Sequence, residues 1–327
     1  MKNSKIIFFE REFPSANMVL IKDQHSILID TGFGSDAKIT EQLIKAEGVS
    51  PEELQLIVNT HYHSDHVGGN FYLQKNYGVK IAGHKWDADL INACDPEACS
   101  AEWLDQPVEP YQVNLKLSDN DEIYTGNKTL KVVHTPGHTL GHISLYDPEE
   151  EIFFSGDLFH RNDVGWLNIF REGVSSIQRS LESIDRVSKL RIRHAYSGHG
   201  PEIENPLSSI DTARKRLEKW LKSPEKVAWH ACKRIFAFTL IMKNGLPKQE
   251  IDKYLLNCGW FQDISRYSFQ LQPEEFINPL IDEMIRSKAA EWNNNYLMPT
   301  ITYQAPQEEW MSKNIKPKGW QSQDFHL

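Results

Sequence analysis

The segment that decides the fold is residues 60–70, which reads Thr-His-Tyr-His-Ser-Asp-His-Val-Gly-Gly-Asn. His61, His63, Asp65 and His66 stand close together in it, directly after the apolar, strand-like run at 56–59. Imidazole nitrogens and carboxylate oxygens are ligands that zinc and related divalent metals bind, and a tight loop at a strand's end can direct several of them to one point. The segment therefore predicts a metal site.

Further candidate ligands lie in three other glycine-containing segments, each of which follows a strand-like run. These segments are His134-Thr-Pro-Gly-His138-Thr-Leu-Gly-His142, Ser155-Gly156-Asp157 and Ser197-Gly198-His199-Gly200. In layered α/β proteins the functional groups gather at one set of strand ends. We therefore expect His138, Asp157 and His199 to join the first segment, and we interpret His134 and His142 as supporting or surface residues.

The order of the predicted elements favours an α/β architecture for residues 1–205. Short strands rich in Ile and Val are predicted at 5–9, 18–21 and 26–29, and they are followed by helices and further strands. Helices are predicted at 36–46 and 175–187. Alternation of this kind indicates sheets covered by helices.

Residues 206–327 have a different texture, in which helix signals replace strand signals. Proline and glycine punctuation predicts three helices, at 223–245, at 247–259 and from 273 onward. A small hairpin is predicted over 290–298, so the outline is that of a winged-helix module. We divide the chain into 1–205 and 206–327, with a tail at 306–327 that we expect to be partly extended.

Composition places the chain among soluble proteins. Of its 327 residues 40% are hydrophobic and 25% charged, and no apolar run approaches the roughly 20 residues that span a bilayer. The short apolar stretch at the N-terminus ends at Glu10, which is too early for a signal peptide. We therefore expect a cytoplasmic protein with no membrane partner. The net charge of −9 is unevenly distributed: residues 206–327 hold 17 Lys and Arg against 14 Asp and Glu, a net charge of +3, which leaves −12 for residues 1–205.

The motifs THYHSDH, HTPGHTLGH, FSGD and SGHGP together resemble the metallo-β-lactamase superfamily over roughly residues 1–205, including Ile29-Asp30-Thr31-Gly32. The resemblance implies an αββα sandwich, in which two β-sheets pack together between outer helices. It implies two divalent metal ions, with zinc expected and Mn²⁺ or Fe²⁺ left open. It also implies the following roles: His61, His63 and His138 for the first metal, Asp65, His66 and His199 for the second, Asp157 as the bridge, and Asp30 as support.

This arrangement predicts a hydrolase. Two divalent ions lower the pKa of a bridging water from 15.7 towards about 7 and polarise a carbonyl or phosphoryl oxygen. Asp65 would orient the resulting hydroxide and carry its proton, so Asp65 and Asp157 are the predicted catalytic residues. An aspartate at position 157 resembles the glyoxalase II, lactonase and ribonuclease branches of the family. The true β-lactamases lack it, so we expect hydrolysis of an ester, thioester or lactone and no β-lactamase activity.

The loop after Asp157 is expected to form one wall of the pocket. Lactonases of this family often carry a tyrosine where this chain has His160, and that histidine either donates a proton to the leaving group or is simply exposed. Arg161 and Trp166 suit an anionic or partly apolar substrate, and Tyr196 is expected nearby.

The alternative function is a nuclease or a nucleic-acid-binding protein. The C-terminal helices resemble in outline the β-lactamase-like protein 2 group, in which a winged-helix-like extension accompanies cleavage of single-stranded RNA. Residues 206–327 show neither a strong basic stripe nor an evident platform of stacking aromatics. We therefore expect this region to cover the metal face and shape access to it for a small-molecule substrate. A homodimer is left open.

Overall fold

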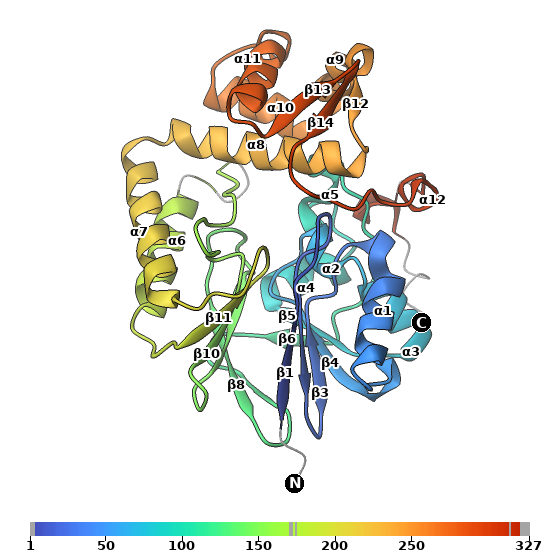
Figure 1. Cartoon of the computed structure of the whole chain (residues 1–327), viewed down its shortest axis with the longest axis vertical. Helices are drawn as coiled ribbons and strands as arrows, with labels where there is room; N and C mark the ends of the chain where they lie inside the picture. Colours follow the sequence, from blue (N-terminus) through green and yellow to red (C-terminus); the bar gives the residue numbers. More distant parts are fainter. Residues whose placement is uncertain (1–3, 170–172, 174, 314, 321–327) are drawn as a thin grey trace.

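The computed structural model describes residues 4–169, 173, 175–313 and 315–320. Two β-sheets stand face to face, helices lie on their outer sides, and a long helix, α8, crosses above one end of both sheets (Figure 1). The first two sheets with their helices form the expected layered α/β body, and a smaller, mostly helical part lies on the far side of α8.

The first sheet has six strands in the order β1-β2-β3-β4-β5-β6. Their bounds are β1 Lys5–Phe9, β2 Met18–Lys22, β3 Ser26–Ile29, β4 Leu54–Val58, β5 Ile81–His84 and β6 Leu115–Leu117. β1, β2 and β3 are antiparallel neighbours, whereas the pairs from β3 to β6 are parallel. The helices of this part are α1 Ala37–Ala46, α2 Ser64–Val67, α3 Asn70–Tyr77, α4 Lys85–Asn92 and α5 Ala101–Leu104.

The second sheet has five strands in the order β11-β10-β9-β8-β7. Their bounds are β7 Glu122–Tyr124, β8 Thr129–His134, β9 Ile143–Asp147, β10 Ile152–Gly156 and β11 His194–Ser197. Only the β10–β11 pair is parallel, because helix α6, Ser175–Val187, connects those two strands. Helix α6 packs on the outer face together with α7, Pro206–Lys222.

Central strands of this body are apolar on both faces, which explains why they read as continuous apolar runs. In β3 and β4, Ile29 and Val58 face the second sheet, where they join Leu130 and Leu145 in one buried cluster. Their neighbour Ile57 points the other way, into the cluster under the helices. Successive side chains of a strand alternate between faces, so a strand covered on both sides needs apolar residues at every position.

The C-terminal part contains the expected helices and hairpin, with additional elements. Its elements are α8 Glu225–Met242, β12 Leu246–Pro247, α9 Lys248–Asn257, α10 Gly259–Asp263, α11 Pro273–Arg286, β13 Ala290–Asn293 and β14 Tyr296–Pro299. The three strands form a small sheet in the order β12-β14-β13. We call residues 206–299 the cap. Its description as a winged helix, and the boundary between 205 and 206, stay predictions.

One helix was not predicted from the sequence. Helix α7 was missed, although Asn205 accepts a hydrogen bond from the Ser208 amide and Pro206 occupies the first helical turn, which is a usual helix start. At Pro51 the chain forms one 3₁₀ turn, Pro51–Glu53, and continues directly into β4. The tail forms a short helix, α12 Glu308–Met311, and a turn at Pro317–Gly319. In the described part of the chain, no helix has the length and apolar character needed to cross a membrane.

Candidate active site

Loops that follow four strands deliver seven metal-compatible side chains to one region beneath α8. His61, His63, Asp65 and His66 follow β4 or lie in the short helix α2, while His138, Asp157 and His199 follow β8, β10 and β11. Within the seven, three overlapping groups bring their ligand atoms to within 4.8 Å of one another. The groups are His61, His63 and His138; His61, His66 and Asp157; and Asp65, His66 and His199.

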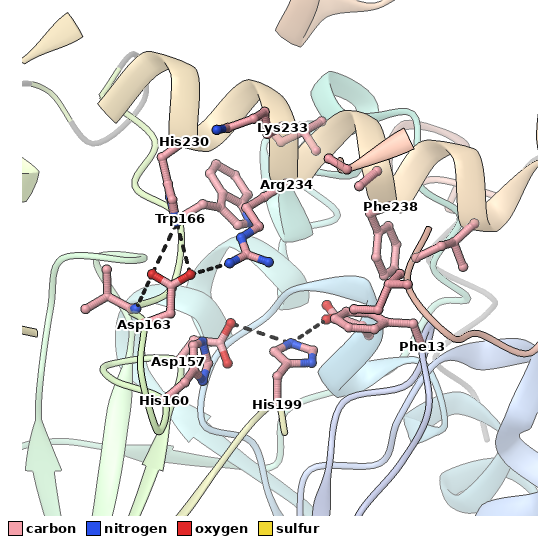
Figure 2. Close-up of a pocket in the computed structure, with 18 of the residues that line it drawn as sticks. Phe13, Asp157, His160, Asp163, Trp166, His199, His230, Lys233, Arg234 and Phe238 are labelled. Carbon is pink, nitrogen blue, oxygen red and sulfur yellow. Dashed lines mark hydrogen bonds and ion pairs between the residues drawn. The ribbon is translucent and has the colours of Figure 1, made fainter. Parts of the chain in front are cut away.

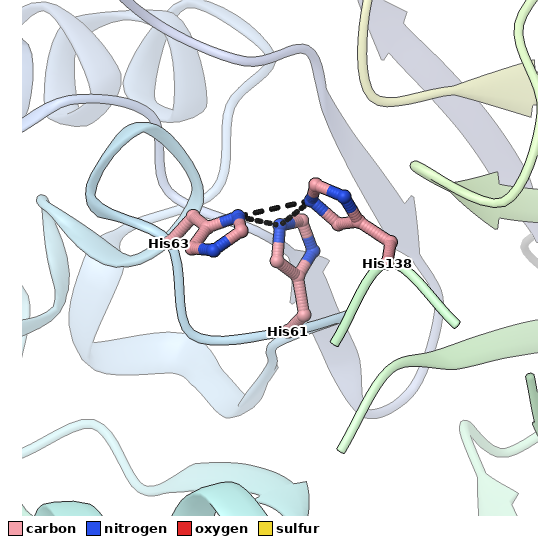
Figure 3. A group of neighbouring side chains, drawn as sticks. All are labelled: His61, His63 and His138. Atoms are coloured by element: carbon pink, nitrogen blue, oxygen red, sulfur yellow. Dashed lines mark hydrogen bonds between the residues drawn. The ribbon is translucent and has the colours of Figure 1, made fainter. Parts of the chain in front are cut away.

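Three imidazole rings from two loops converge on a common point (Figure 3). The Nε2 atom of His61 lies 3.1 Å from His63 Nδ1 and 3.1 Å from His138 Nε2, and the last two atoms are 2.9 Å apart. All three rings are buried. Nitrogen atoms from three loop positions at this spacing have the composition and closeness of a metal-binding triad.

A second group lies beside the triad and shares a carboxylate with it. His199 Nε2 is 3.2 Å from Asp65 Oδ2, and His66 Nε2 is 3.8 Å from the same oxygen. Asp157 lies between the two groups, with Oδ2 3.6 Å from His138 Nε2 and 3.7 Å from His199 Nε2. This position is the one that a bridging carboxylate needs.

Burial and charge hold two of the triad histidines neutral and Asp157 ionised, which are the forms that bind a metal. Burial, together with the neighbouring imidazoles, lowers the pKa of His61 and of His63 well below the ordinary value, so both rings stay neutral at pH 7. Burial alone would raise the pKa of Asp157. The charges of His199 and His66 outweigh that effect and hold it well below the ordinary value, so the carboxylate stays ionised.

Supporting contacts fix which nitrogen of each ring faces the site. The backbone carbonyl of Trp166 can only accept, so His138 Nδ1, 2.5 Å away, donates to it and leaves the Nε2 lone pair directed at the triad. Asp30 Oδ2 lies 2.8 Å from His66 Nδ1 and orients that ring in the same way. The amide and hydroxyl of Thr60 donate to Asp30 in turn. Asp30 thus lies where a supporting carboxylate is expected.

His142 acts behind the site. Its ring is fully buried, and Nε2 accepts a hydrogen bond of 3.0 Å from the Asp157 amide, so it positions the strand end that carries Asp157. Close backbone approach is also needed here. A Cβ atom on Gly198 would lie 2.3 Å from Asp157 Oδ1 and 2.7 Å from His66 Cε1, so any side chain at position 198 would displace two metal-compatible groups.

A cavity of about 630 Å³ opens above these groups, and α8 forms its opposite wall (Figure 2). The floor includes His63, Asp65, Asp157 and His199. The α8 side chains that line it are His230, Lys233, Arg234, Ile235, Ala237, Phe238 and Ile241. The cap therefore covers the metal-compatible groups and shapes access to them, as the sequence led us to expect.

Of the four pocket residues expected from the sequence, two line the cavity and two do not. Trp166 lines the cavity, and its ring stacks on His63 at 5.3 Å. His160 also lines it, and burial lowers the pKa of its imidazole to about 4. Arg161 was wrongly expected to form the wall: its side chain is exposed and lies outside the cavity lining. Tyr196 packs behind the site, between Phe8 and Phe154.

The cap contributes cavity residues that no sequence motif predicted. His230, Lys233 and Arg234 carry the polar part of the wall, and Phe238 carries an apolar part. No local motif marks them, because each is an ordinary residue on a long helix. Their spacing of three and four along α8 is a signal that they share one helix face, but it does not tell which surface that face covers.

The sequence-family model described as "Metallo-beta-lactamase superfamily" matches residues 11–199. This chain belongs to that superfamily. The matched segment covers more than half of the chain and contains all seven metal-compatible residues.

Named relatives include hydrolases of thioesters. A hydroxyacylglutathione hydrolase of Pelagibacter ubique is 33% identical over 177 residues, which are 51% of this chain and 65% of that protein, slightly less than two thirds of its length. The human acyl-coenzyme A thioesterase MBLAC2 is 29% identical over 196 residues, or 52% of this chain and 69% of that protein. A beta-lactamase-like protein 2 homolog of Caenorhabditis elegans is 30% identical over 57% of this chain and 55% of its own length.

Solved structures show the same fold. A metallo-beta-lactamase mutant from Cronobacter sakazakii superposes with a TM-score of 0.58 at 20% identity, covering 67% of this chain and 94% of that one. A metallo-beta-lactamase family protein from Thermus thermophilus gives a TM-score of 0.56 at 21% identity and covers 91% of this chain and 99% of that one. The second superposition extends well beyond residues 11–199, so it includes much of the cap.

Proposed function

We propose that this chain is a metal-dependent hydrolase that cleaves a carboxylic ester, thioester or lactone, with zinc as the expected metal. The observation that carries the proposal is the convergence of seven metal-compatible side chains at the floor of one cavity. The names of the Pelagibacter and human relatives support cleavage of a thioester.

The residues present fit two divalent cations. His66 Nε2 and Asp157 Oδ1 are buried, lie 3.5 Å from each other and make no hydrogen bond, which is costly unless another group satisfies them. The three triad nitrogens lie 2.9–3.1 Å apart, and His138 Nε2 carries a lone pair. Because each neutral imidazole has only one N–H, the three nitrogens do not all satisfy one another, and a cation between them would accept their lone pairs. His61, His63 and His138 would hold one ion, Asp65, His66 and His199 the other, and Asp157 would lie between them.

Bound divalent ions supply an activated water and polarise the scissile carbonyl. The chain's own groups supply orientation and proton transfer. Asp65 is partly exposed to the cavity, and its carboxylate is 3.2 Å from His199, so it can hold a proton taken from water during attack. His160 also lines the cavity, with its ring 5.6 Å from the His199 ring, so it can contact the leaving group of a bound substrate. Trp166 and α8 would limit the access of bulk water to the floor.

Assays on the full chain test the proposal. Metal-replete protein should hydrolyse at least one of three substrate classes: a simple ester, a thioester and a lactone. Chelation should remove the activity, and added zinc or manganese should restore it. The Asp211→Asn variant is a matched control, because Asp211 is an exposed α7 residue paired with Lys215. If fully loaded protein turned over none of the three classes, the proposal would be wrong.

A further inference from the structure

The face of α8 that covers the site changes its chemistry along the helix. Six of its cavity-lining residues fall into two series with a spacing of four, His230-Arg234-Phe238 and Lys233-Ala237-Ile241, and Ile235 also lines the cavity. Residues at this spacing lie on one side of a helix. Each series begins with a cation or an imidazole and ends with an apolar residue. The change occurs within about 12 Å, the rise over eight helical residues.

The apolar end of this face adjoins the second metal-compatible group directly. Phe238 contacts Phe13 edge-on at 6.4 Å and Phe33 at 6.0 Å. Phe13 stacks on the His199 ring at 5.0 Å with an interplanar angle of 10°. Leu104 and Ile301 also line the cavity. An apolar surface therefore begins one ring away from a candidate metal ligand (Figure 2).

The polar end carries cations that are largely compensated. Asp163 pairs with both Arg216 and Arg234, and Lys233 pairs with Glu283. Arg234 is half exposed, with 50% of its side chain accessible, and among the described residues its contact is with Asp163 alone. A guanidinium has five N–H donors, so Arg234 retains donors for one more anion. This capacity suits a single carboxylate better than a polyphosphate.

We propose that the cavity binds an amphipathic ester or thioester, with an apolar acyl chain against Phe238 and Phe13 and an anionic leaving group beside Arg234. This inference rests on the proposed function and specifies its substrate class. The scissile carbonyl then lies between the two ends, above Asp65 and Asp157. Hydrolysis adds water to the acyl carbon and breaks its bond to sulfur or oxygen. The products are a carboxylic acid and a protonated thiol or alcohol, and no further reactant is needed.

The acyl end is tested with thioesters of 3-mercaptopropionate whose acyl chains run from two to twelve carbons. Burial of one methylene stabilises a complex by about 0.8 kcal/mol, so kcat/KM should rise by up to about fourfold per methylene until the apolar end is filled. In Phe238→Ala this rise should flatten, and Phe238→Leu should retain most of it. Leu221→Ala, which removes an exposed apolar side chain from α7, should leave the wild-type slope unchanged.

The anionic end is tested with a matched pair of leaving groups, 3-mercaptopropionate and its methyl ester. Wild-type protein should prefer the carboxylate by about tenfold in kcat/KM, the usual size of one charge-assisted hydrogen bond. Arg234→Gln should lose that preference through a higher KM, and its acyl-chain slope should remain. Equal loss for both leaving groups would indicate a structural role and would contradict the assignment of Arg234.

Binding measurements separate this inference from the proposed function. Titration calorimetry of the full chain with S-alkyl-3-mercaptopropionates, thioethers that cannot be hydrolysed, needs no turnover. Affinity should increase with alkyl length in wild type and much less in Phe238→Ala. Length-independent binding in wild type, or a flat chain-length profile in an active enzyme, would overturn the amphipathic-substrate proposal alone. Absence of hydrolysis together with length-dependent binding would overturn the hydrolase proposal and leave the binding preference standing.

Discussion

The metal-site loops and the cap form opposite walls of one cavity, yet their residues are encoded in the sequence in different ways. The loop residues stand in short motifs, because a metal restricts both the kind of ligand and its distance from the others. The α8 residues form no motif, because a wall needs only suitable size and polarity on one face of a helix. In this chain, therefore, the proposed reaction type can be predicted from short local motifs. The proposed substrate preference depends instead on which helix the fold places over the site.

One carboxylate of the loop after β10 contacts two helices of the cap. Asp163 lies in the loop between Asp157 and Trp166, accepts hydrogen bonds from His230 and Arg234 of α8, and forms an ion pair with Arg216 of α7. The same loop is closed by hydrogen bonds from His160 N to Asp163 O and from Gly165 N to Asp157 O. The position of the cap is therefore coupled to the position of the proposed bridging carboxylate.

Substitutions of the metal-site loops should have the largest effect. We expect Asp157→Ala and Asp65→Ala each to lower kcat/KM by about a thousandfold or more, the scale on which loss of a metal ligand or of a proton-transfer group operates. Asp157→Ala should also lower metal content, because Asp157 is the only proposed bridge. Steady-state kinetics and elemental analysis measure both effects. Near wild-type turnover in either folded variant would show that the mechanism is wrong.

Metal removal should have the next largest effect, and that effect should arise from the loops at the cavity floor, where the proposed ligands lie. Wild-type protein should contain two metal ions per chain. An ion whose free concentration is a thousand times its dissociation constant stabilises the folded chain by about 4 kcal/mol. Chelation should therefore lower the free energy of unfolding by about that amount for each ion removed. Denaturant titrations with and without chelator measure this change. A single bound ion after reconstitution would contradict the binuclear site.

Breaking the link between the walls should have a moderate effect. Although burial alone would raise the pKa of Asp163, its hydrogen bond from His230 and the nearby arginine charges hold it far below the ordinary aspartate value. A depressed folded-state pKa adds stability above the unfolded-state pKa of about 3.9, and that stability is lost as the pH falls below it. Asp163→Asn should therefore lower the free energy of unfolding by about 2 kcal/mol at pH 7, a value between the costs of breaking an exposed and a buried ion pair.

The pH dependence provides the control for that variant. The difference in stability between wild type and Asp163→Asn should narrow as the pH falls below about 4, because Asp163 is then protonated in the unfolded chain. Asp211→Asn should show little effect at any pH, since its pair with Lys215 is exposed. A difference between wild type and Asp163→Asn that did not change with pH would mean that packing, and not charge, links the cap to the loop.

Nucleic-acid binding by the cap should be the smallest effect. Its cations at the cavity are compensated by Asp163 and Glu283, so we expect weak binding of single-stranded RNA with a shallow salt dependence. Affinity measured between ~50 and 200 mM salt checks this, since a protein with about six phosphate contacts would lose about a thousandfold over that range. Submicromolar binding with a steep slope would favour the nuclease alternative.

The sequence predicts the metal-site loops better than the cap for a physical reason. Glycine beside a metal-compatible residue at a strand end is a local signal, so all seven candidates could be named before any contact was known. Arg161 was misplaced because the direction of a side chain in a loop depends on long-range packing. Helix α7 was missed because its Asn205-Pro206 start follows another proline and glycine cluster that reads as a loop. Phe238 could not be assigned to the site, since its role comes from a contact with Phe13, far away in sequence.

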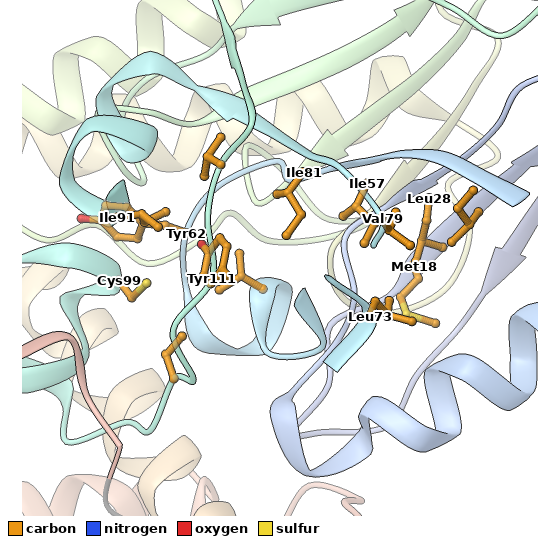
Figure 4. Packing of buried hydrophobic residues seen from close by; sticks show 14 of the residues in the cluster. Met18, Leu28, Ile57, Tyr62, Leu73, Val79, Ile81, Ile91, Cys99 and Tyr111 are labelled. Atoms are coloured by element: carbon orange, nitrogen blue, oxygen red, sulfur yellow. The ribbon is translucent and has the colours of Figure 1, made fainter. Parts of the chain in front are cut away.

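The tail that follows the cap packs on the body. Trp310 packs on Phe33 and fills the space above Gly34. Trp320 contacts Tyr111, one of the buried residues labelled in Figure 4. Trp320 also donates a hydrogen bond to the Val108 carbonyl. The body therefore holds the chain on both sides of the cavity roof, through the packing of α7 on α6 before α8 and through the tail after β14. A movement that lifted α8 away from the floor would also have to stretch or release the tail, so we expect the tail to limit how far the roof can open.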